Sequence, residues 1–246
     1  MKILDDVEIV DNVPAIYIKS LDAIVIGDLH LGFEGIAAEQ GVFIPKIQFK
    51  EEMEMMNKII KEKKSEKIIL LGDIKHEFSE TTYHEFKEVR DFLNFLKINF
   101  KKVIVIKGNH DNFIFYLTKK LRVELYDDLC IGNYFFSHGH RDIDLRSISA
   151  ENIVIAHEHP AIALFDEIGG KEIVKCFLIG KLKEKNIIIL PAFSSLSYGT
   201  EINIVEEFLS PFLEKIKDKM YDFEAIGIDK DVGILRFGKI KNLPKR

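Results

Sequence analysis

The sequence predicts an α/β protein whose first half runs β-α-β-α-β and whose second half is richer in antiparallel strands. Two patterns in the 246 residues support this fold class. Short apolar runs rich in β-branched residues alternate with longer stretches in which apolar residues recur every three or four positions. No Pro- or Ser-rich stretch interrupts the chain, so we expect residues 1–246 to form a single domain.

The first half contains three expected strands and two expected helices. The strands are predicted at Ala23–Ile26, Lys67–Leu71 and Val103–Ile106, and the helices at Lys46–Lys63 and Tyr83–Leu96. The helical stretches have the apolar spacing of an amphipathic helix, whereas the strand runs are short and rich in Ile, Val and Leu. This order of elements indicates an open α/β sheet.

The second half is dominated by expected strands. A short helix is predicted at Asn112–Lys120, and a later helix near Pro211–Lys219 precedes a hairpin in FEAIGIDKDVGILRF with its turn at Asp229–Asp231. Six further strands are expected between these helices, at Val123–Tyr126, Leu129–Ile131, Tyr134–Ser137, Ile153–Ala156, Ile173–Ile179 and Ile187–Leu190.

Five polar segments lie at or just past the ends of predicted strands. They read GDLHLG (27–32), GDIKHEF (72–78), GNHD (108–111), FFSHGH (135–140) and VIAHEHP (154–160), and seven of the eight histidines lie in them. The eighth, His84, lies on an exposed-looking helix. Open α/β sheets place their ligand crevice at the carboxyl ends of the strands. Each segment alone is also a good turn sequence. Together they offer oxygen and nitrogen donors without sulfur, the donor set for two divalent metals such as manganese, iron, cobalt, nickel or zinc.

Composition limits the class of protein. The chain is 47% apolar, and no apolar run approaches the ~20 residues of a membrane span. The acidic amino terminus differs from a signal peptide, so a cytoplasmic protein without a membrane partner is expected. Cys130 and Cys176 have no CxxC partner, so free thiols are expected. The net charge of -5 is not that of a protein that binds nucleic acid by phosphate neutralisation alone.

The order DxH, GDx, GNHD, HG and xHxH across residues 28–159 resembles the five blocks of the calcineurin-like metallophosphoesterase superfamily. The chain is most similar to the SbcD-related (archaeal) phosphoesterases and double-strand-break repair nucleases, which share the GDxxH form of the second block. The stretch PAFSSLSYGTEIN (191–203) also resembles small stand-alone members of that branch. The resemblance implies a four-layer α/β/β/α sandwich of two mixed sheets.

The resemblance also implies a ligand set for two divalent ions, manganese first, with nickel, cobalt, iron or zinc as alternatives. One ion would be held by Asp28, His30, Asp73 and His159, and the other by Asp73, Asn109, His138 and His157. The shared carboxylate agrees with the need for a bridging anion between two dications. Ala156 occupies a position that is usually glycine in this superfamily, and we expect its small side chain to preserve the backbone path.

The implied reaction is attack on phosphorus by a hydroxide activated between the two metals. His110 would stabilise the transition state or protonate the leaving oxygen, a contribution of ~10²- to 10⁴-fold for a general acid. His76 is the second catalytic candidate, because many phosphatases of the superfamily have a carboxylate there that orients the catalytic histidine. Asp111 is expected to cap the helix that starts near Asn112. Four residues near the motifs could either contact the substrate or have a structural role: Lys75, Lys107, His140 and Arg141.

These features predict a phosphodiesterase acting on cyclic nucleotides, small diesters or single-stranded nucleic acid ends, with weak binding to long duplex. Lysines cluster in KIIKEKKSEK and at Lys101, Lys102, Lys119 and Lys120, but glutamates interleave the first cluster. The alternatives are a phosphomonoesterase or a DNA-repair nuclease and, more remotely, a non-catalytic scaffold. The native metal, the physiological substrate and the oligomeric state are left open by the sequence.

Overall fold

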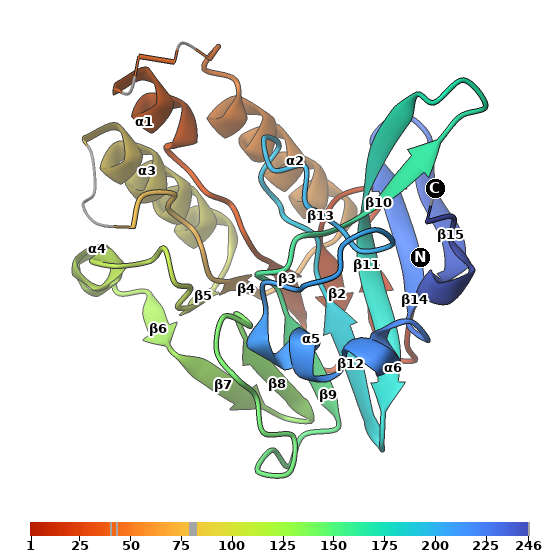
Figure 1. Cartoon of the computed structure of the whole chain (residues 1–246). Coiled ribbons are helices and arrows are strands. Elements are labelled where there is room, and N and C mark those ends of the chain that lie inside the picture. The colour runs from red at the N-terminus through yellow and green to blue at the C-terminus, as the bar shows by residue number, and fades with distance from the viewer. Residues whose placement is uncertain (40, 43, 79–82, 246) are drawn as a thin grey trace.

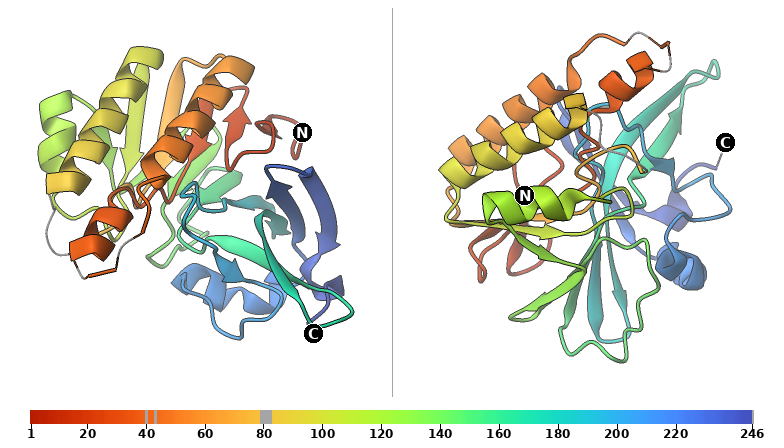
Figure 2. Two further views of the ribbon diagram at one scale, coloured as in Figure 1. Left: turned by 90° about the horizontal axis from the view of Figure 1, so that it is seen from above. Right: turned by 90° about the vertical axis from the view of Figure 1, so that its left-hand side faces the viewer.

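Two mixed β-sheets lie face to face, with helices on the outer side of each, in the computed structural model (Figures 1 and 2). The structure describes residues 1–39, 41, 42, 44–78 and 83–245. Helices α1 to α4 lie on one side of the molecule, and α5 and α6 lie on the other (Figure 1). The predicted α/β fold with two mixed sheets is therefore confirmed.

The first sheet has six strands in the order β1-β2-β3-β4-β5-β6. Strands β3 to β6 are parallel, and β1 and β2 add to the β3 edge as an antiparallel pair. The bounds of the strands are Val7–Ile9 (β1), Ile16–Ile18 (β2), Ala23–Ile26 (β3), Lys67–Leu71 (β4), Lys102–Ile106 (β5) and Glu124–Tyr126 (β6). The associated helices are Phe33–Glu39 (α1), Gln48–Glu62 (α2), Tyr83–Asn99 (α3) and Ile114–Leu121 (α4).

The second sheet runs β13-β10-β11-β12-β9-β8-β7, and the hairpin β14-β15 pairs with β11. Within it, β8, β9 and β12 are parallel to one another, and most other pairs are antiparallel. Its strands are Asp128–Ile131 (β7), Tyr134–Ser137 (β8), Asn152–Ile155 (β9), Pro160–Phe165 (β10), Lys171–Leu182 (β11), Lys185–Ile189 (β12), Thr200–Glu201 (β13), Glu224–Asp229 (β14) and Gly233–Lys239 (β15). Two short helices, Pro211–Lys215 (α5) and Lys217–Met220 (α6), and a 3-10 turn at Ile240–Asn242 complete the described elements.

Apolar side chains alternate between the two faces of each sheet and so form three layers of core. In β3, Ala23 and Val25 belong to the layer between the sheets, whereas Ile24 and Ile26 belong to the layer under α2 and α3. Phe212 of α5 packs in a third layer on the outer face of the second sheet. This alternation follows from the two-residue period of a strand, and it holds the carboxyl ends of both sheets in place.

Several elements differ from the sequence predictions. Residues 123–126 were expected among the strands of the second half, but β6 pairs parallel with β5 and belongs to the first sheet. The last predicted helix divides at Ile216 into α5 and α6. Strands β1, β2, β10 and β13 and helix α1 were not predicted, because most are too short to show a periodic pattern. In the described part of the chain, no helix combines the length and apolar character that crossing a membrane would require.

Candidate metal centre

The carboxyl ends of five parallel strands, β3, β4 and β5 of one sheet and β8 and β9 of the other, bring the polar segments together. Main-chain hydrogen bonds join the first two segments directly, from Asp28 N to Gly72 O (3.0 Å) and from His30 N to Asp73 O (2.8 Å). The fifth segment is tied to the first by a bond from His157 N to Asp28 Oδ2 (3.0 Å). The two sheets are therefore joined at the point where the predicted ligands lie.

The backbone at this junction adopts an uncommon conformation. Among the described residues, ten non-glycine residues have positive φ, and five of them are predicted ligands: Asp28, His30, Asp73, His157 and His159. A left-handed conformation is costly for a residue with a Cβ and tends to persist at functional sites, where the surrounding structure enforces it. The concentration of such residues here indicates that side-chain placement outweighs local backbone preference.

The first group of side chains consists of Asp28, His30 and His159, whose ligand atoms lie within 4.8 Å of one another. His159 Nε2 lies 3.2 Å from Asp28 Oδ1 and 3.4 Å from His30 Nε2. Asp73 Oδ2 lies 3.8 Å from His30 Nε2. The carboxylate of Asp73 therefore borders this group.

The second group consists of Asp73, His138 and His157, also within 4.8 Å of one another. His138 Nε2 lies 3.2 Å from Asp73 Oδ2 and 3.1 Å from Asn109 Oδ1. The other ring nitrogen of His138, Nδ1, lies 2.7 Å from Leu71 O and donates to it. This hydrogen bond leaves Nε2 as the nitrogen that faces the two oxygens. All seven predicted ligands thus lie in two adjoining groups that meet at Asp73.

The chemistry of these atoms fits divalent cations. Asp28 Oδ1 is buried and accepts no hydrogen bond. The oxygens of Asp73 and Asn109 both lie close to Nε2 of His138, a nitrogen that carries a lone pair when the ring is neutral. Burial, reinforced by the neighbouring His159, lowers the pKa of His30 to about 3. Burial and His138 lower the pKa of His157 to about 4. These imidazoles are neutral at pH 7, as metal ligation requires.

Asp73 and His138 shift each other's pKa in opposite directions. Burial opposes the charged form of each, but their mutual hydrogen bond and charge outweigh it and raise the pKa of His138 to about 9. The same interactions, led by the hydrogen bond from His138, lower the pKa of Asp73 despite its burial. Metal binding by His138 would therefore require its ring to lose a proton.

His110 lies at the edge of the two groups and is held by the main chain of the second segment. Its Nδ1 hydrogen-bonds His76 O, and its Nε2 lies 3.8 Å from Asp73 Oδ2. The His76 ring stacks on His110 with ring centroids 5.7 Å apart, and it meets Phe33 edge to face. The main-chain carbonyl of His76, rather than its ring, is in position to orient His110. His30, His76 and His110 also form a third group with ligand atoms within 4.8 Å.

Asp111 does not cap the following helix, contrary to the sequence prediction. Helix α4 begins at Ile114, and the fully buried Asp111 accepts hydrogen bonds from Gly108 N (2.8 Å) and Ile74 N (2.9 Å). It thus joins the second and third segments. Gly108 is required by their close approach, since a Cβ on it would lie 2.1 Å from Asp73 Oδ1. Burial, with Asp73 nearby, raises the pKa of Asp111 to about 6.

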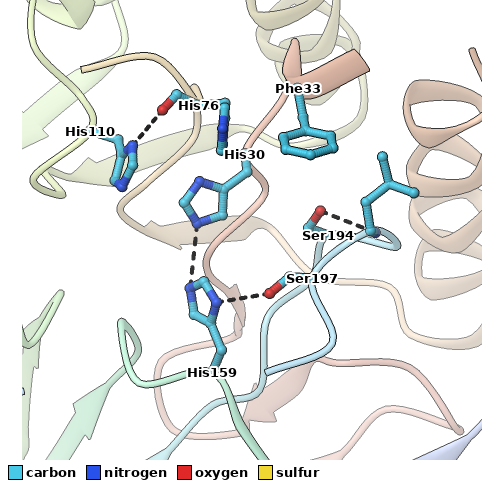
Figure 3. A pocket seen from close by; sticks show the side chains of 8 residues that line it. His30, Phe33, His76, His110, His159, Ser194 and Ser197 are labelled. Carbon is cyan, nitrogen blue, oxygen red and sulfur yellow. Dashed lines mark hydrogen bonds between the residues drawn. The ribbon is translucent and has the colours of Figure 1, made fainter. Parts of the chain in front are cut away.

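A serine that sequence reasoning did not single out contacts one of the predicted ligands. Ser197 Oγ lies 2.9 Å from His159 Nδ1 (Figure 3). The loop that carries Ser197 is tied to the first segment by hydrogen bonds from Phe193 N to Gly27 O and from Ser194 N to Asp28 O, each 2.9 Å. Ser197 lies within PAFSSLSYGTEIN, the stretch noted for its resemblance to stand-alone phosphoesterases, and that resemblance was the available signal.

Polar side chains, half-buried at Lys175 and buried at Gln48 and Glu52, hold the loop that carries Ser197. The ammonium group of Lys175, on β11, donates to the carbonyl oxygens of Ala192 (3.0 Å) and Ser194. Gln48 Nε2, at the start of α2, lies 2.9 Å from Ser194 Oγ and 2.9 Å from Glu52 Oε1. No pattern in the sequence distinguishes these residues from a solvated helix face or an ordinary strand.

Two cations near the motifs, Lys75 and Arg141, are engaged by partners outside the two ligand groups. Lys75 is buried and its ammonium donates to Glu77 O. Arg141 is exposed and pairs with Asp128 at 3.2 Å. His140 is half-buried, with its ring centroid 5.3 Å from that of His138, and burial lowers its pKa to about 4. Lys107 is half-buried just after β5.

Ala156, which stands where the superfamily usually has glycine, is fully buried against Gly27. A Cβ added to Gly27 would lie only 2.9 Å from the methyl group of Ala156. The absence of a side chain at Gly27 therefore makes room for Ala156.

A pocket of about 270 Å³ opens onto the first group. Its lining consists of His30, Phe33, His76, His110, His159, Ser194, Leu196 and Ser197 (Figure 3). Four imidazoles from four different segments point into it, and Phe33 and Leu196 supply apolar walls. The pocket is thus suited to a ligand with a polar end at the histidines and an apolar part beside Phe33.

The chain is similar to known proteins in sequence pattern and in fold. The family model described as calcineurin-like phosphoesterase matches residues 22–217. The Pseudomonas putida nuclease MPE has a similar structure, with a TM-score of 0.60, 22% identity, and coverage of 87% of this chain and 88% of the other.

Two further structures are similar at lower TM-scores. A protein of unknown function from Aquifex aeolicus has a TM-score of 0.38 and 19% identity, covering 60% of this chain and 81% of its own. A predicted phosphoesterase from Streptococcus pneumoniae has a TM-score of 0.34 and 12% identity, covering 87% and 88%. These two similarities carry no argument about the site. No curated protein sequence matches the chain significantly.

Proposed function

Because the chain belongs to the calcineurin-like phosphoesterase family, we propose that it is a metal-dependent phosphodiesterase of the SbcD-related branch. Its substrates would be cyclic nucleotides, other small diesters or the single-stranded ends of nucleic acids. The observation that carries the proposal is the buried, acceptor-rich junction at Asp73, with His110 held beside it. The nuclease structure supports the fold at 22% identity, so the substrate class depends on the site itself.

The proposed ligands divide between two ions. Asp73 would be shared; Asp28, His30 and His159 would complete one site, and Asn109, His138 and His157 the other. When bound, divalent ions in such a site activate water and neutralise charge on phosphate oxygens. Manganese is the first candidate, and nickel, cobalt, iron and zinc also suit these donors.

The chain's own contribution to proton transfer would come from His110. Its Nδ1 is occupied by the carbonyl of His76, so Nε2 is the atom that can carry a proton to a leaving oxygen. A carbonyl accepts from Nδ1 in both protonation states of the ring, and it therefore holds the ring orientation throughout proton transfer. His76 would add its stacked ring to this support, which is the catalytic role we assign to it.

The lining of the pocket favours diesters over monoesters. No Lys or Arg is among its described lining residues, and Lys75 and Arg141 are engaged elsewhere. A dianionic monoester gains more from such cations than a monoanionic diester does. A diester also carries a second substituent, which the apolar wall of Phe33 and Leu196 would accommodate. The net charge of -5 argues against tight binding of long duplex.

The test compares bis-p-nitrophenyl phosphate with p-nitrophenyl phosphate in added manganese, followed by cyclic nucleotides and labelled single- and double-stranded DNA. We expect higher kcat/KM for the diester and preference for single strands or ends. Faster hydrolysis of the monoester would make the protein a phosphomonoesterase. Efficient, salt-sensitive cutting of long duplex would favour a repair nuclease, and hydrolysis of neither ester in any of the five metals would favour a scaffold.

A further inference from the structure

Helix α4 directly follows the segment that carries His110, and its outer face is both aromatic and basic. Phe113, Phe115 and Tyr116 are 57%, 53% and 69% exposed. The opposite face packs into the core through Ile114 and Leu117. Because the helix is anchored by these apolar residues, the exposed aromatic rings are not needed to hold it in place.

The basic residues of this helix lie beside the aromatic ones. The stretch NFIFYLTKKLR (112–122) contains Lys119, Lys120 and Arg122 and no acidic residue, in a chain whose net charge is -5. On a helical projection, Phe115, Tyr116, Lys119 and Lys120 fall on one side, since residues three and four apart are neighbours. Lys119 Nζ lies 5.5 Å from the centre of the Phe115 ring. The face therefore alternates ring surfaces with positive charge.

The residues that precede α4 are tied to the candidate catalytic histidine through Phe78. Phe78 is 47% exposed, and its ring centroid lies 3.7 Å from that of His110. A hydrogen bond of 3.0 Å from Asn112 Nδ2 to Phe78 O ties Phe78 to the residues before α4. Phe113 has a φ of 68°, a left-handed conformation that is unfavourable for a bulky residue. Exposed aromatic residues therefore lie both beside His110 and on α4, and Asn112 links the two places. Helix α4 lies in the foreground of the right-hand view in Figure 2.

We propose that Phe113, Phe115, Tyr116, Lys119 and Lys120 form a platform that binds single-stranded nucleic acid and leads it to the metal centre; this inference rests on the proposed function. Exposed aromatic rings bind successive bases by stacking, irrespective of their sequence, and adjacent lysines bind the phosphates. The eight residues of α4 span about 12 Å, enough for a few nucleotides. A duplex offers no unstacked bases, so the platform selects single strands.

The test measures binding separately from hydrolysis. Anisotropy of a fluorescein-labelled phosphorothioate dT12, which resists cleavage, reports binding to the manganese-loaded protein. The double variant Phe115→Ala/Tyr116→Ala should bind at least tenfold more weakly, given the loss of stacking. Its kcat/KM for dT12 should fall at least tenfold relative to that for bis-p-nitrophenyl phosphate. The matched control Ile168→Ala/Val232→Ala removes exposed apolar side chains from other loops and should bind as the wild type does.

The lysines are tested by salt dependence. Lys119→Gln/Lys120→Gln should reduce the slope of log affinity against log salt by about 1.4. The control Lys61→Gln/Lys64→Gln, which changes exposed lysines in the last turn of α2 and just beyond it, should not change the slope. Wild-type-like dT12 binding by the aromatic variant would overturn the platform, even if bis-p-nitrophenyl phosphate is hydrolysed. If the aromatic variant retains dT12 binding but loses the wild type's binding to anionic vesicles, the face binds membranes and the proposed platform is overturned. Failure of diester hydrolysis with intact dT12 binding would instead contradict the proposed function alone.

Discussion

Replacement of Asp73 by asparagine should weaken both metal sites together. Asp73 Oδ2 lies 3.2 Å from His138 Nε2 in one group and 3.8 Å from His30 Nε2 in the other. Asparagine keeps nearly the same shape and can still accept the hydrogen bond from His110 N, which is 2.9 Å long. The substitution therefore removes mainly one negative charge from the junction.

The expected loss can be worked out from this charge. Two unit charges 4 Å apart interact by about 4 kcal/mol at an effective dielectric constant of 20, and a dication interacts more strongly. A loss of about 4 kcal/mol is roughly a thousandfold in affinity for each ion. At micromolar manganese, Asp73→Asn should retain little of either ion, and hydrolysis should be abolished.

The assay is metal content by mass spectrometry after dialysis, together with initial rates on bis-p-nitrophenyl phosphate. Asp218→Asn removes an exposed carboxylate from α6 and should keep two ions and full activity. His159→Ala should weaken mainly one ion, because His159 belongs only to the first group. An Asp73→Asn protein with two bound ions and wild-type turnover would refute the bridging assignment.

Three further outcomes are expected. His110→Ala should keep both metals and lose ~10²- to 10⁴-fold in kcat, with exposed His84→Ala as control; loss of metal would instead make His110 a ligand. Apparent manganese affinity, measured by titration calorimetry, should rise about tenfold per pH unit up to about pH 9, because Asp73 raises the pKa of His138 to about 9 and metal binding would require the His138 ring to lose its proton. An affinity that stays constant from pH 7 to 9 would exclude this linkage. Ser197→Ala should weaken the binding of one metal ion about 10- to 100-fold, because His159 Nδ1 loses its hydrogen-bond partner, whereas the neighbouring Ser195→Ala should leave metal affinity unchanged. Equal effects of the two substitutions would indicate a general disturbance of the loop.

The sequence by itself determined most of the strands and the types of donor atom. Strands β3 and β4 end where their apolar runs end, because a buried parallel strand requires a continuous apolar segment. The donors follow directly, because the chain leaves the sheet at the end of each strand. The sequence also predicted that the clustered side chains would offer oxygen and nitrogen atoms without sulfur, because this property depends on residue type alone.

The tertiary structure decided which atoms meet. Asp73 lies between the two groups because loops from both sheets converge there, and the left-handed backbone at His157 and His159 is enforced by packing rather than by local preference. Asp111 was expected to cap a helix, but its carboxylate bonds the main chain of another segment, 37 residues away at Ile74. The proposed roles of Ser197 and of the aromatic face of α4 likewise depend on contacts with residues distant in the sequence. Local sequence patterns indicate whether a side chain is buried or exposed, whereas contacts between distant segments depend on how the two sheets pack together.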